Sequence, residues 1–138
     1  MSTHSSIAVM QKDGKVKSIY CHFDGYLQGV GAKLLTYYND EEKANAIVDL
    51  GSLSYLDDKL EPTKPGHNFD HPEPDVTVAY HRDRGEDFQQ EVYQDLDFYK
   101  FDMDMTFSYI FKDGKWFTYT KKCRRFDELT PERVGEIE

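Results

Sequence analysis

The residue types used in nucleophilic catalysis occur side by side at Cys21, His22 and Asp24. Neighbours on a strand point to opposite faces, so Cys21 and His22 are not expected to form a catalytic dyad. A buried, structural Cys21 is favoured, because free cysteine is commonly buried. His22 and Asp24 share a face by alternation, which indicates a polar binding pair at the end of a strand.

A second group of polar side chains follows the predicted strand 76–80 and contains His81, Arg82 and Arg84. The planar fork of arginine matches the oxygens of a phosphate or carboxylate. Surface pairing of these arginines with neighbouring acids is the alternative, and base rates favour it. If the predicted strands 16–23 and 76–80 are neighbours, this group and the pair of His22 and Asp24 meet at one end of the sheet.

A glycine-punctuated junction follows Asp24 and opens a predicted helix. Unpaired backbone N–H groups at such a junction bind an anion or a partner's carboxylate, whereas the same glycines also let a strand and a helix pack closely. Both interpretations remain open from the sequence. The candidate ligand-binding residues are His22, Asp24, Gly25, Gly29, Gly31, His81, Arg82 and Arg84.

His67 and His71 are the third candidate group, with a spacing that would suit two metal ligands on a helix. Pro65, Gly66 and Pro72 instead predict a loop, so exposed loop histidines are favoured over a metal centre. No established catalytic motif is present elsewhere. We therefore expect no metal and no cofactor, and a non-enzymatic role is favoured while an enzymatic one stays open.

Two hairpins are the clearest structural elements, because each combines β-branched and aromatic strands with a Lys-Asp-Gly-Lys turn. The predicted hairpin strands are 6–11 with 16–23, and 106–111 with 116–120. Helical spacing of apolar residues predicts helices over 29–38 and 41–50, with Gly51 as the stop of the second.

Other segments are less regular. Residues 52–56 are expected to form a turn, and 61–75 a Pro/His-rich loop that is the main functional-loop candidate. Residues 88–105 fit neither helix nor strand clearly, although alternation around Phe101 favours strand toward their end. The acidic tail 127–138 is expected to fray or to form a short helix near Pro131. Together these elements predict one α+β domain over 1–138, with a mainly antiparallel sheet and two helices, inserted after the N-terminal hairpin, packed on one face.

The charge is -9 in 138 residues and is unevenly distributed. Residues 40–104 carry 18 acids and 6 bases, whereas residues 105–126 carry 1 acid and 6 bases. The acidic excess argues against nucleic-acid binding, and we expect the basic run 121–125 to pair within the chain. It allows attraction to a basic protein surface, with ordinary solvation as the alternative.

The two cysteines, Cys21 and Cys123, have no CxxC pairing, which fits a reduced cytosolic protein. The sequence has no N-terminal apolar region of the signal-peptide type and no apolar run of membrane-spanning length. We therefore expect a cytoplasmic protein that does not contact the membrane, and a homo-oligomer is left open.

Residues 1–40 carry a resemblance to a known group, through Ser-Thr-His-Ser-Ser-Ile-Ala, then Ser-Ile-Tyr-Cys-His-Phe-Asp-Gly-Tyr, then Gly-Val-Gly. This pattern resembles a family of small, uncharacterised proteins encoded by phages and prophages, with an SIYCHxDGYxxGVG-type motif. In that family Trp often stands at the position of Phe23 and Pro at that of Leu27. The resemblance implies a phage-encoded protein in the host cytoplasm and brings no catalytic residues with it.

Two hypotheses follow. The first is a non-enzymatic phage accessory protein that binds and inhibits a basic host factor, such as a defence or nucleic-acid-handling protein. The second is a small-molecule or nucleotide-binding domain, or an enzyme, that uses the strand-turn-helix junction 22–31 together with 81–84. The first is favoured, because the acidic segment and the missing catalytic motifs agree with it.

Overall fold

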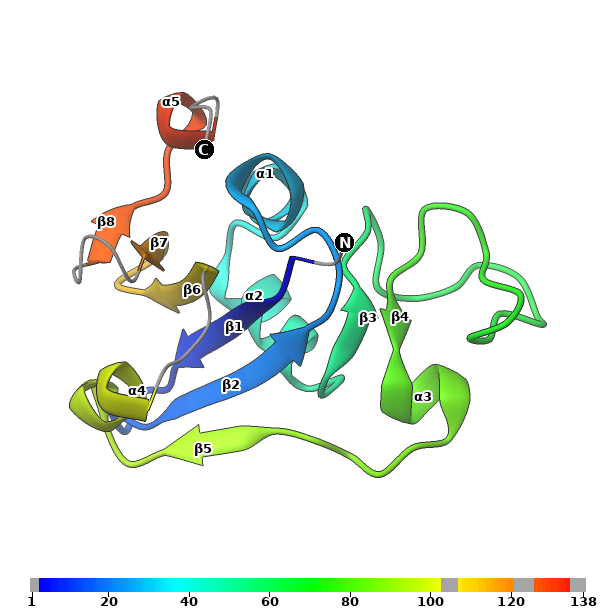
Figure 1. The fold of residues 1–138 in the computed structure, drawn as a ribbon, viewed down its shortest axis with the longest axis horizontal. Helices are drawn as coiled ribbons and strands as arrows, with labels where there is room; N and C mark the ends of the chain where they lie inside the picture. The colour runs from blue at the N-terminus through cyan, green and yellow to red at the C-terminus, as the bar shows by residue number, and fades with distance from the viewer. Residues whose placement is uncertain (1–2, 103–106, 121–125, 135–138) are drawn as a thin grey trace.

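Two β-hairpins form the centre of the sheet in the computed structural model, which describes residues 3–102, 107–120 and 126–134 (Figure 1). The hairpin strands are β1 (Ser5–Met10) with β2 (Val16–Cys21), and β6 (Phe107–Lys112) with β7 (Lys115–Thr120). β1 and β6 pair in parallel, which joins the hairpins into one sheet. Both predicted hairpins are confirmed.

Shorter elements complete the domain. The remaining strands are β3 (Leu53–Tyr55), β4 (Val78–Ala79), β5 (Glu91–Tyr93) and β8 (Phe126–Glu128). The helices are the π-helical turn η1 (Leu27–Gly31), α1 (Ala32–Tyr37), α2 (Glu41–Val48), α3 (Tyr80–Arg84), α4 (Leu96–Asp102) and α5 (Pro131–Val134). The strand order is β4-β3-β2-β1-β6-β7-β8, with β5 also pairing with β2. This mixed, mostly antiparallel sheet and its helices form the single α+β domain that the sequence predicts.

The two Lys-Asp-Gly-Lys segments form different turns. In the second hairpin Lys112 pairs with Lys115, which leaves a two-residue turn. In the first, the N–H of Gln11 donates to the carbonyl of Lys15 at 2.7 Å, which leaves a three-residue loop with Gly14 at φ 88°. The register of the first hairpin therefore differs by one residue from that of a two-residue Asp-Gly turn.

The helices that follow the first hairpin, α1 and α2, pack on one face of the sheet, as predicted. Asp40 caps α2, because its carboxylate accepts a hydrogen bond from the N–H of Lys43 at 2.8 Å. Gly51, at φ 78°, lies just beyond the end of this helix. Alternate strand residues form the core beneath the helices, among them Ile7, Val9, Ile19, Cys21, Tyr109 and Phe111.

The opposite face of the sheet is covered by α4, in the region that the sequence leaves undecided. Tyr99 of α4 is fully buried against Ala8, Val16 and Ile110. Its hydroxyl lies 2.9 Å from the hydroxyl of Ser6 on β1. The strand that alternation favours at Phe101 is therefore wrong, because this residue belongs to α4. The alternation further on, at 103–105, lies outside the described residues.

Segments around the Pro/His-rich loop differ from the sequence prediction in two places. Residues 53–55 form strand β3 rather than a turn, since they pair with β2 and β4. The strand predicted over 76–80 shrinks to β4, because Tyr80 already begins α3. Residues 61–75 contain no helix or strand, as predicted.

The C-terminal part pairs with the sheet before it ends. β8 joins the edge of the sheet beside β7. Of the two alternatives expected for the tail, fraying or a short helix, the structure shows the helix, α5, which begins at Pro131. The basic run 121–125, including Cys123, and residues 135–138 lie outside the described residues. Among the helices that the structure describes, none combines the length and apolar character needed to span a bilayer.

Candidate binding cleft

A cleft of about 570 Å³ lies between the edge of β2 and the segment that joins α3 to β5. Its lining residues are Tyr20, Ser52, Tyr80, Gly85, Glu86, Asp87 and Gln89. The cleft forms where β2 changes partner: β5 pairs with residues 16–18, and β3 pairs with Cys21. Tyr20 lies between these two pairings and lines the cleft.

Backbone hydrogen bonds fix the walls of the cleft. The N–H of Ser52 donates to the carbonyl of Gln89 at 3.0 Å, and the N–H of Tyr80 donates to the carbonyl of Ser52 at 3.1 Å. Gly85, at φ 78°, ends α3 in the left-handed conformation and turns the chain toward β5. The cleft is thus built on paired backbone rather than on a free loop.

The cleft combines aromatic rings with carboxylates. Burial, together with the neighbouring Tyr80 and Cys21, raises the pKa of Tyr20, so its phenol is neutral at physiological pH. Glu86 and Asp87 are exposed, and Glu86 forms an ion pair with Arg84 at 3.4 Å, whereas Asp87 forms none with the described residues. The wall is therefore negatively charged beside two tyrosine rings.

Phe88 adds an exposed aromatic surface next to the cleft. Its side chain is 47% exposed, and its ring packs edge-on against the ring of His81, with 5.6 Å between the ring centroids. Nδ1 of His81 lies 2.7 Å from the carbonyl oxygen of Glu86, which is within hydrogen-bond distance. His81 thus helps to hold the cleft segment in place.

A histidine and tyrosine group adjoins the cleft through Tyr20. The hydroxyl of Tyr20 lies 2.6 Å from Nδ1 of His22 and is also hydrogen-bonded to Nδ1 of His4. The rings of His4 and His22 are 4.7 Å apart, and Phe23 packs edge-on against His22. The sequence singles out His22 but misses His4 and Tyr20. The register Ser5↔Cys21 places His4 opposite His22, and this register is visible in the structure but not in the turn sequence.

The junction glycines lie against the chain itself. The N–H of Gly25 donates to the carbonyl of Thr3 at 2.8 Å, and the N–H of Gly29 donates to Tyr26 at 3.0 Å. A Cβ on Gly29 would lie 2.2 Å from the carbonyl oxygen of Asp24. Close packing therefore accounts for these two glycines, and their N–H groups are already paired.

Asp24 and Gly31 also have local contacts. Asp24 has φ 59°, its carbonyl accepts from the N–H of Val30 at 2.8 Å, and its carboxylate is 3.4 Å from the hydroxyl of Tyr26. Gly31 is buried, and a Cβ there would meet the ring of Tyr109 at 3.4 Å. The ligand-binding role predicted for the junction stays a prediction.

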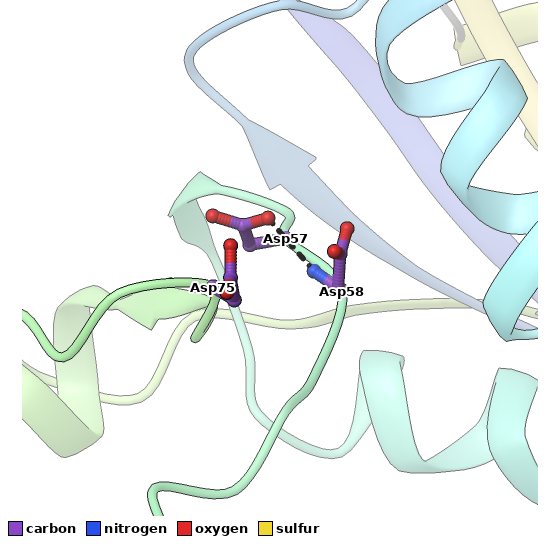
Figure 2. Close-up of side chains that lie close together, drawn as sticks. All are labelled: Asp57, Asp58 and Asp75. Carbon is purple, nitrogen blue, oxygen red and sulfur yellow. Dashed lines mark hydrogen bonds between the residues drawn. The ribbon is translucent and has the colours of Figure 1, made fainter.

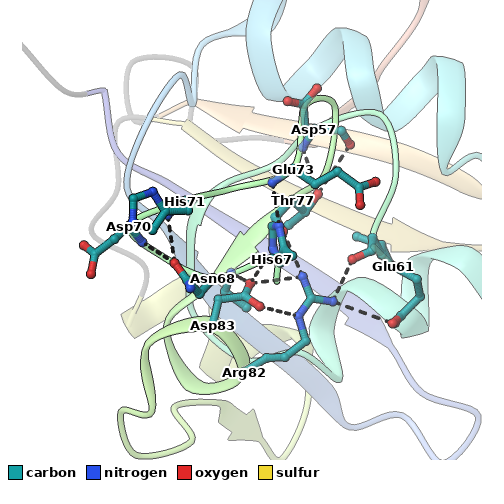
Figure 3. A network of polar contacts seen from close by, with 12 residues as sticks. Asp57, Glu61, His67, Asn68, Asp70, His71, Glu73, Thr77, Arg82 and Asp83 are labelled. Carbon is teal, nitrogen blue, oxygen red and sulfur yellow. Dashed lines mark hydrogen bonds and ion pairs between the residues drawn. The ribbon is translucent and has the colours of Figure 1, made fainter. Parts of the chain in front are cut away.

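Arg82 is held within the fold (Figure 3). Its guanidinium donates to the carbonyls of Leu60 at 2.6 Å and Thr77 at 2.8 Å, and to both carboxylate oxygens of Asp83. Asp83 also accepts from the N–H of Ala79 at 2.8 Å. Burial would raise the pKa of Asp83, but Arg82 and this N–H lower it below its ordinary value. The pair ties α3 to the start of the Pro/His-rich loop.

Arg84 lies further out on α3. Its guanidinium packs over the ring of Phe69 at 4.5 Å, and it pairs with Glu86. No hydrogen bond or ion pair in the described part of the chain joins His22 or Asp24 to His81, Arg82 or Arg84. Within the described residues, the two predicted groups are therefore not in direct contact, and none of these five side chains is among those that line the cleft.

The Pro/His-rich loop is anchored by His67 and Glu73 (Figure 3). The side chain of His67 is 2% exposed, its Nδ1 accepts from the N–H of Glu73 at 2.9 Å, and its Nε2 lies 3.3 Å from Asp83. The Glu73 carboxylate accepts hydrogen bonds from the N–H groups of Thr63 and Lys64. His71 is exposed. His67 therefore serves the fold, and the two histidines do not face one site.

Three carboxylates gather beside α1, from Asp57, Asp58 and Asp75 (Figure 2). Their oxygens lie within 4.8 Å of one another. Lys33 pairs with Asp57 at 3.1 Å and with Asp58 at 2.6 Å, and it lowers the pKa of Asp58. Because Lys33 already pairs with two of the three carboxylates, we assign the cluster a structural role that joins α1 to the segment after β3.

Cys21 is fully buried in the core, as the sequence favours. Burial raises the pKa of its thiol to about 12. A nucleophile needs its thiolate form at working pH, so this position is chemically inert in the folded protein.

Comparison with known proteins adds no function by analogy: no protein-family model matches the chain, and neither a curated protein nor a solved structure shows significant similarity to it. The cleft and its neighbours are thus the basis for any functional assignment.

Proposed function

We propose that this chain is a non-enzymatic accessory protein of the phage type, which binds and inhibits a basic factor of the host in its cytoplasm. The observation that carries the proposal is the cleft, where Tyr20 and Tyr80 lie beside the carboxylates of Glu86 and Asp87. Aromatic rings next to carboxylates suit the aliphatic stem and cationic head of a lysine or arginine side chain.

The distribution of acids supports a basic partner. The exposed acids of the middle segment are Asp40, Glu41, Glu42, Asp49, Glu61, Asp70, Asp75, Glu86, Asp87, Glu91 and Asp97. Few of them have a cationic partner within the described chain. Such a surface accelerates encounter with a positively charged protein, and the effect weakens with salt.

The size of the cleft and its exposed aromatic neighbours support a specific contact. About 570 Å³ is enough for one large side chain of a partner with the backbone around it. Phe88 beside the cleft and Phe23 beside His22 are 47% and 42% exposed, which is the kind of apolar surface that protein interfaces bury. Acids would set the orientation, and the rings would supply most of the affinity.

The alternative of a nucleotide or small molecule at the junction 22–31 has less support. An anion there needs free backbone N–H groups, but those of Gly25, Gly29 and Val30 donate to carbonyls of the chain. Of the two arginines considered for a phosphate, Arg82 donates its hydrogen bonds to Leu60, Thr77 and Asp83. Arg84 pairs with Glu86 and packs on Phe69.

The test is recovery of a partner from a host lysate on the immobilised full chain, followed by measurements with the purified partner. We expect one basic protein, whose recovery falls as salt rises and whose activity is inhibited by stoichiometric amounts of the chain. Absence of a partner at both low and moderate salt contradicts the proposal. So does a partner that binds without salt dependence or keeps full activity.

A further inference from the structure

Three donor atoms from two strands converge beside the cleft. They are Nδ1 of His4, Nδ1 of His22 and the hydroxyl oxygen of Tyr20, which is within hydrogen-bond distance of both nitrogens. His4 precedes β1, whereas Tyr20 and His22 share one face of the strand β2 and the residue after it. The hairpin register aligns His4 with His22, so a rigid element brings the three side chains together.

Hydrogen bonding in this group requires a defined tautomer of each histidine. A phenol has one proton to donate, and a neutral imidazole has one nitrogen that accepts and one that donates. Because both Nδ1 atoms face the same oxygen, Tyr20 donates to one of them, and the other must carry its own proton on Nδ1. Two imidazoles of different tautomeric form are thus required around one hydroxyl group.

We propose that His4, Tyr20 and His22 bind a first-row transition-metal cation, with Zn²⁺ as the ion to test. Imidazole nitrogen is a preferred ligand of zinc and copper, and a phenolate oxygen supplies a hard anionic donor. On binding, the Tyr20 O–H bond breaks, its proton passes to solvent, and the oxygen bonds to the cation. The imidazole that carried its proton on Nδ1 moves that proton to Nε2 through solvent, so that both Nδ1 atoms have a lone pair for the metal. The metal keeps its oxidation state, so no further reactant is needed.

The donor atoms must move apart when a metal binds. Ligands at the usual zinc distances in a tetrahedral site are about 3.3 Å apart, against 2.6 Å between the Tyr20 oxygen and Nδ1 of His22. All three side chains are half-buried, so rotation about their side-chain bonds can open this spacing. Three protein ligands leave a fourth position for water or for a group of a partner.

The electrostatics of the region also favour a cation. The phenolate would offset one of the two charges of the metal, and the chain has a net charge of -9. Glu86 and Asp87 lie in the cleft that Tyr20 also lines. Because a phenol must lose its proton to become an anionic ligand, metal binding releases a proton and strengthens as pH rises. The site is independent of the proposed partner, because it requires only these three side chains.

The experiment is titration of the full chain with Zn²⁺ by calorimetry, and with Co²⁺ while recording the visible spectrum. We expect one equivalent bound, a tetrahedral Co²⁺ spectrum, tyrosinate absorption in the near ultraviolet and affinity that increases with pH. Tyr20→Phe should remove the tyrosinate signal and weaken binding roughly tenfold or more. His22→Gln should weaken metal binding at least as strongly as Tyr20→Phe.

His71→Gln is the matched control, because His71 is exposed in the Pro/His-rich loop. We expect this variant to bind like the wild type, and circular dichroism of each apo variant checks that it folds. The proposal is overturned if binding is absent, if no tyrosinate signal accompanies it, or if His71→Gln weakens it as much as His22→Gln does. The last result would assign the metal to the surface loop.

Discussion

Tyr20 and Tyr80 line the same cleft, although Tyr20 belongs to β2 and Tyr80 is the first residue of α3. Their proximity follows from the sheet: β3 pairs with β2 on one side and with β4 on the other, and α3 begins directly after β4. The Pro/His-rich loop between β3 and β4 therefore determines where Tyr80 and the acids after it lie.

Gly29→Ala should lower the free energy of unfolding by about 2 kcal/mol, because overpacking at a closed site costs this order of energy. The new Cβ would lie 2.2 Å from the carbonyl oxygen of Asp24, which must keep its hydrogen bond from Val30. Urea unfolding measures the change. Thr36→Ala, on the exposed side of α1, is the control and should have little effect. Equal stability of Gly29→Ala and the wild type would contradict close packing at the junction.

Asp83→Asn should destabilise the protein by about 2 kcal/mol, since a charged acceptor of several hydrogen bonds is lost. Arg82 and the N–H of Ala79 both depend on this carboxylate. Hydrogen exchange should show the largest loss of protection in residues 61–75. Asp70→Asn, an exposed acid of the same loop, serves as the comparison. If both variants behave alike, the network does not anchor the loop.

Acid should destabilise the protein in part through Asp83. Its pKa is below the ordinary value in the folded state, so its contribution is fully present above the unfolded pKa of about 3.9 and is lost as pH falls through the folded pKa. Unfolding free energies measured from neutral pH down to pH about 3 should therefore fall less steeply in Asp83→Asn than in the wild type. Parallel curves would show that another group controls the acid transition.

Cys21 should not react with a thiol reagent in the native state. Its side chain is fully buried, and its thiol has a pKa of about 12. The measurement uses a Cys123→Ser variant, so that Cys21 is the one thiol left to react with the reagent. Labelling should proceed at the rate of unfolding and become immediate in denaturant. Rapid labelling of the native protein, with the fold intact, would reopen a chemical role for this residue.

The sequence predicts the fold where local signals agree with the tertiary structure. Both hairpins and the helix capped by Asp40 have strong local patterns, and the structure confirms them. β3 is missed because its three residues are stabilised by pairing with β2 and β4 rather than by their own sequence. α4 is missed because its aromatic residues suit strand and helix equally, and burial of Tyr99 decides between them.

The candidate site is harder to predict, because it depends on register. Identical Lys-Asp-Gly-Lys turns give a two-residue turn in one hairpin and a three-residue loop in the other. That single residue decides which side chain lies opposite His22, so His4 cannot be assigned from the turn sequence. Tyr20 is missed because its role comes from the change of partner along β2, which is a property of the whole sheet.

The measurement that tests the central claim most directly is the affinity for the purified partner, across a salt series, of two charge-matched variants. Glu86→Gln/Asp87→Asn removes the cleft carboxylates, and Glu41→Gln/Glu42→Gln removes two exposed acids of α2. We predict that the cleft variant binds roughly tenfold more weakly, equivalent to about 1.4 kcal/mol, with a reduced salt dependence, and that the α2 variant stays close to the wild type. Equal affinities of the two variants would contradict binding at the cleft.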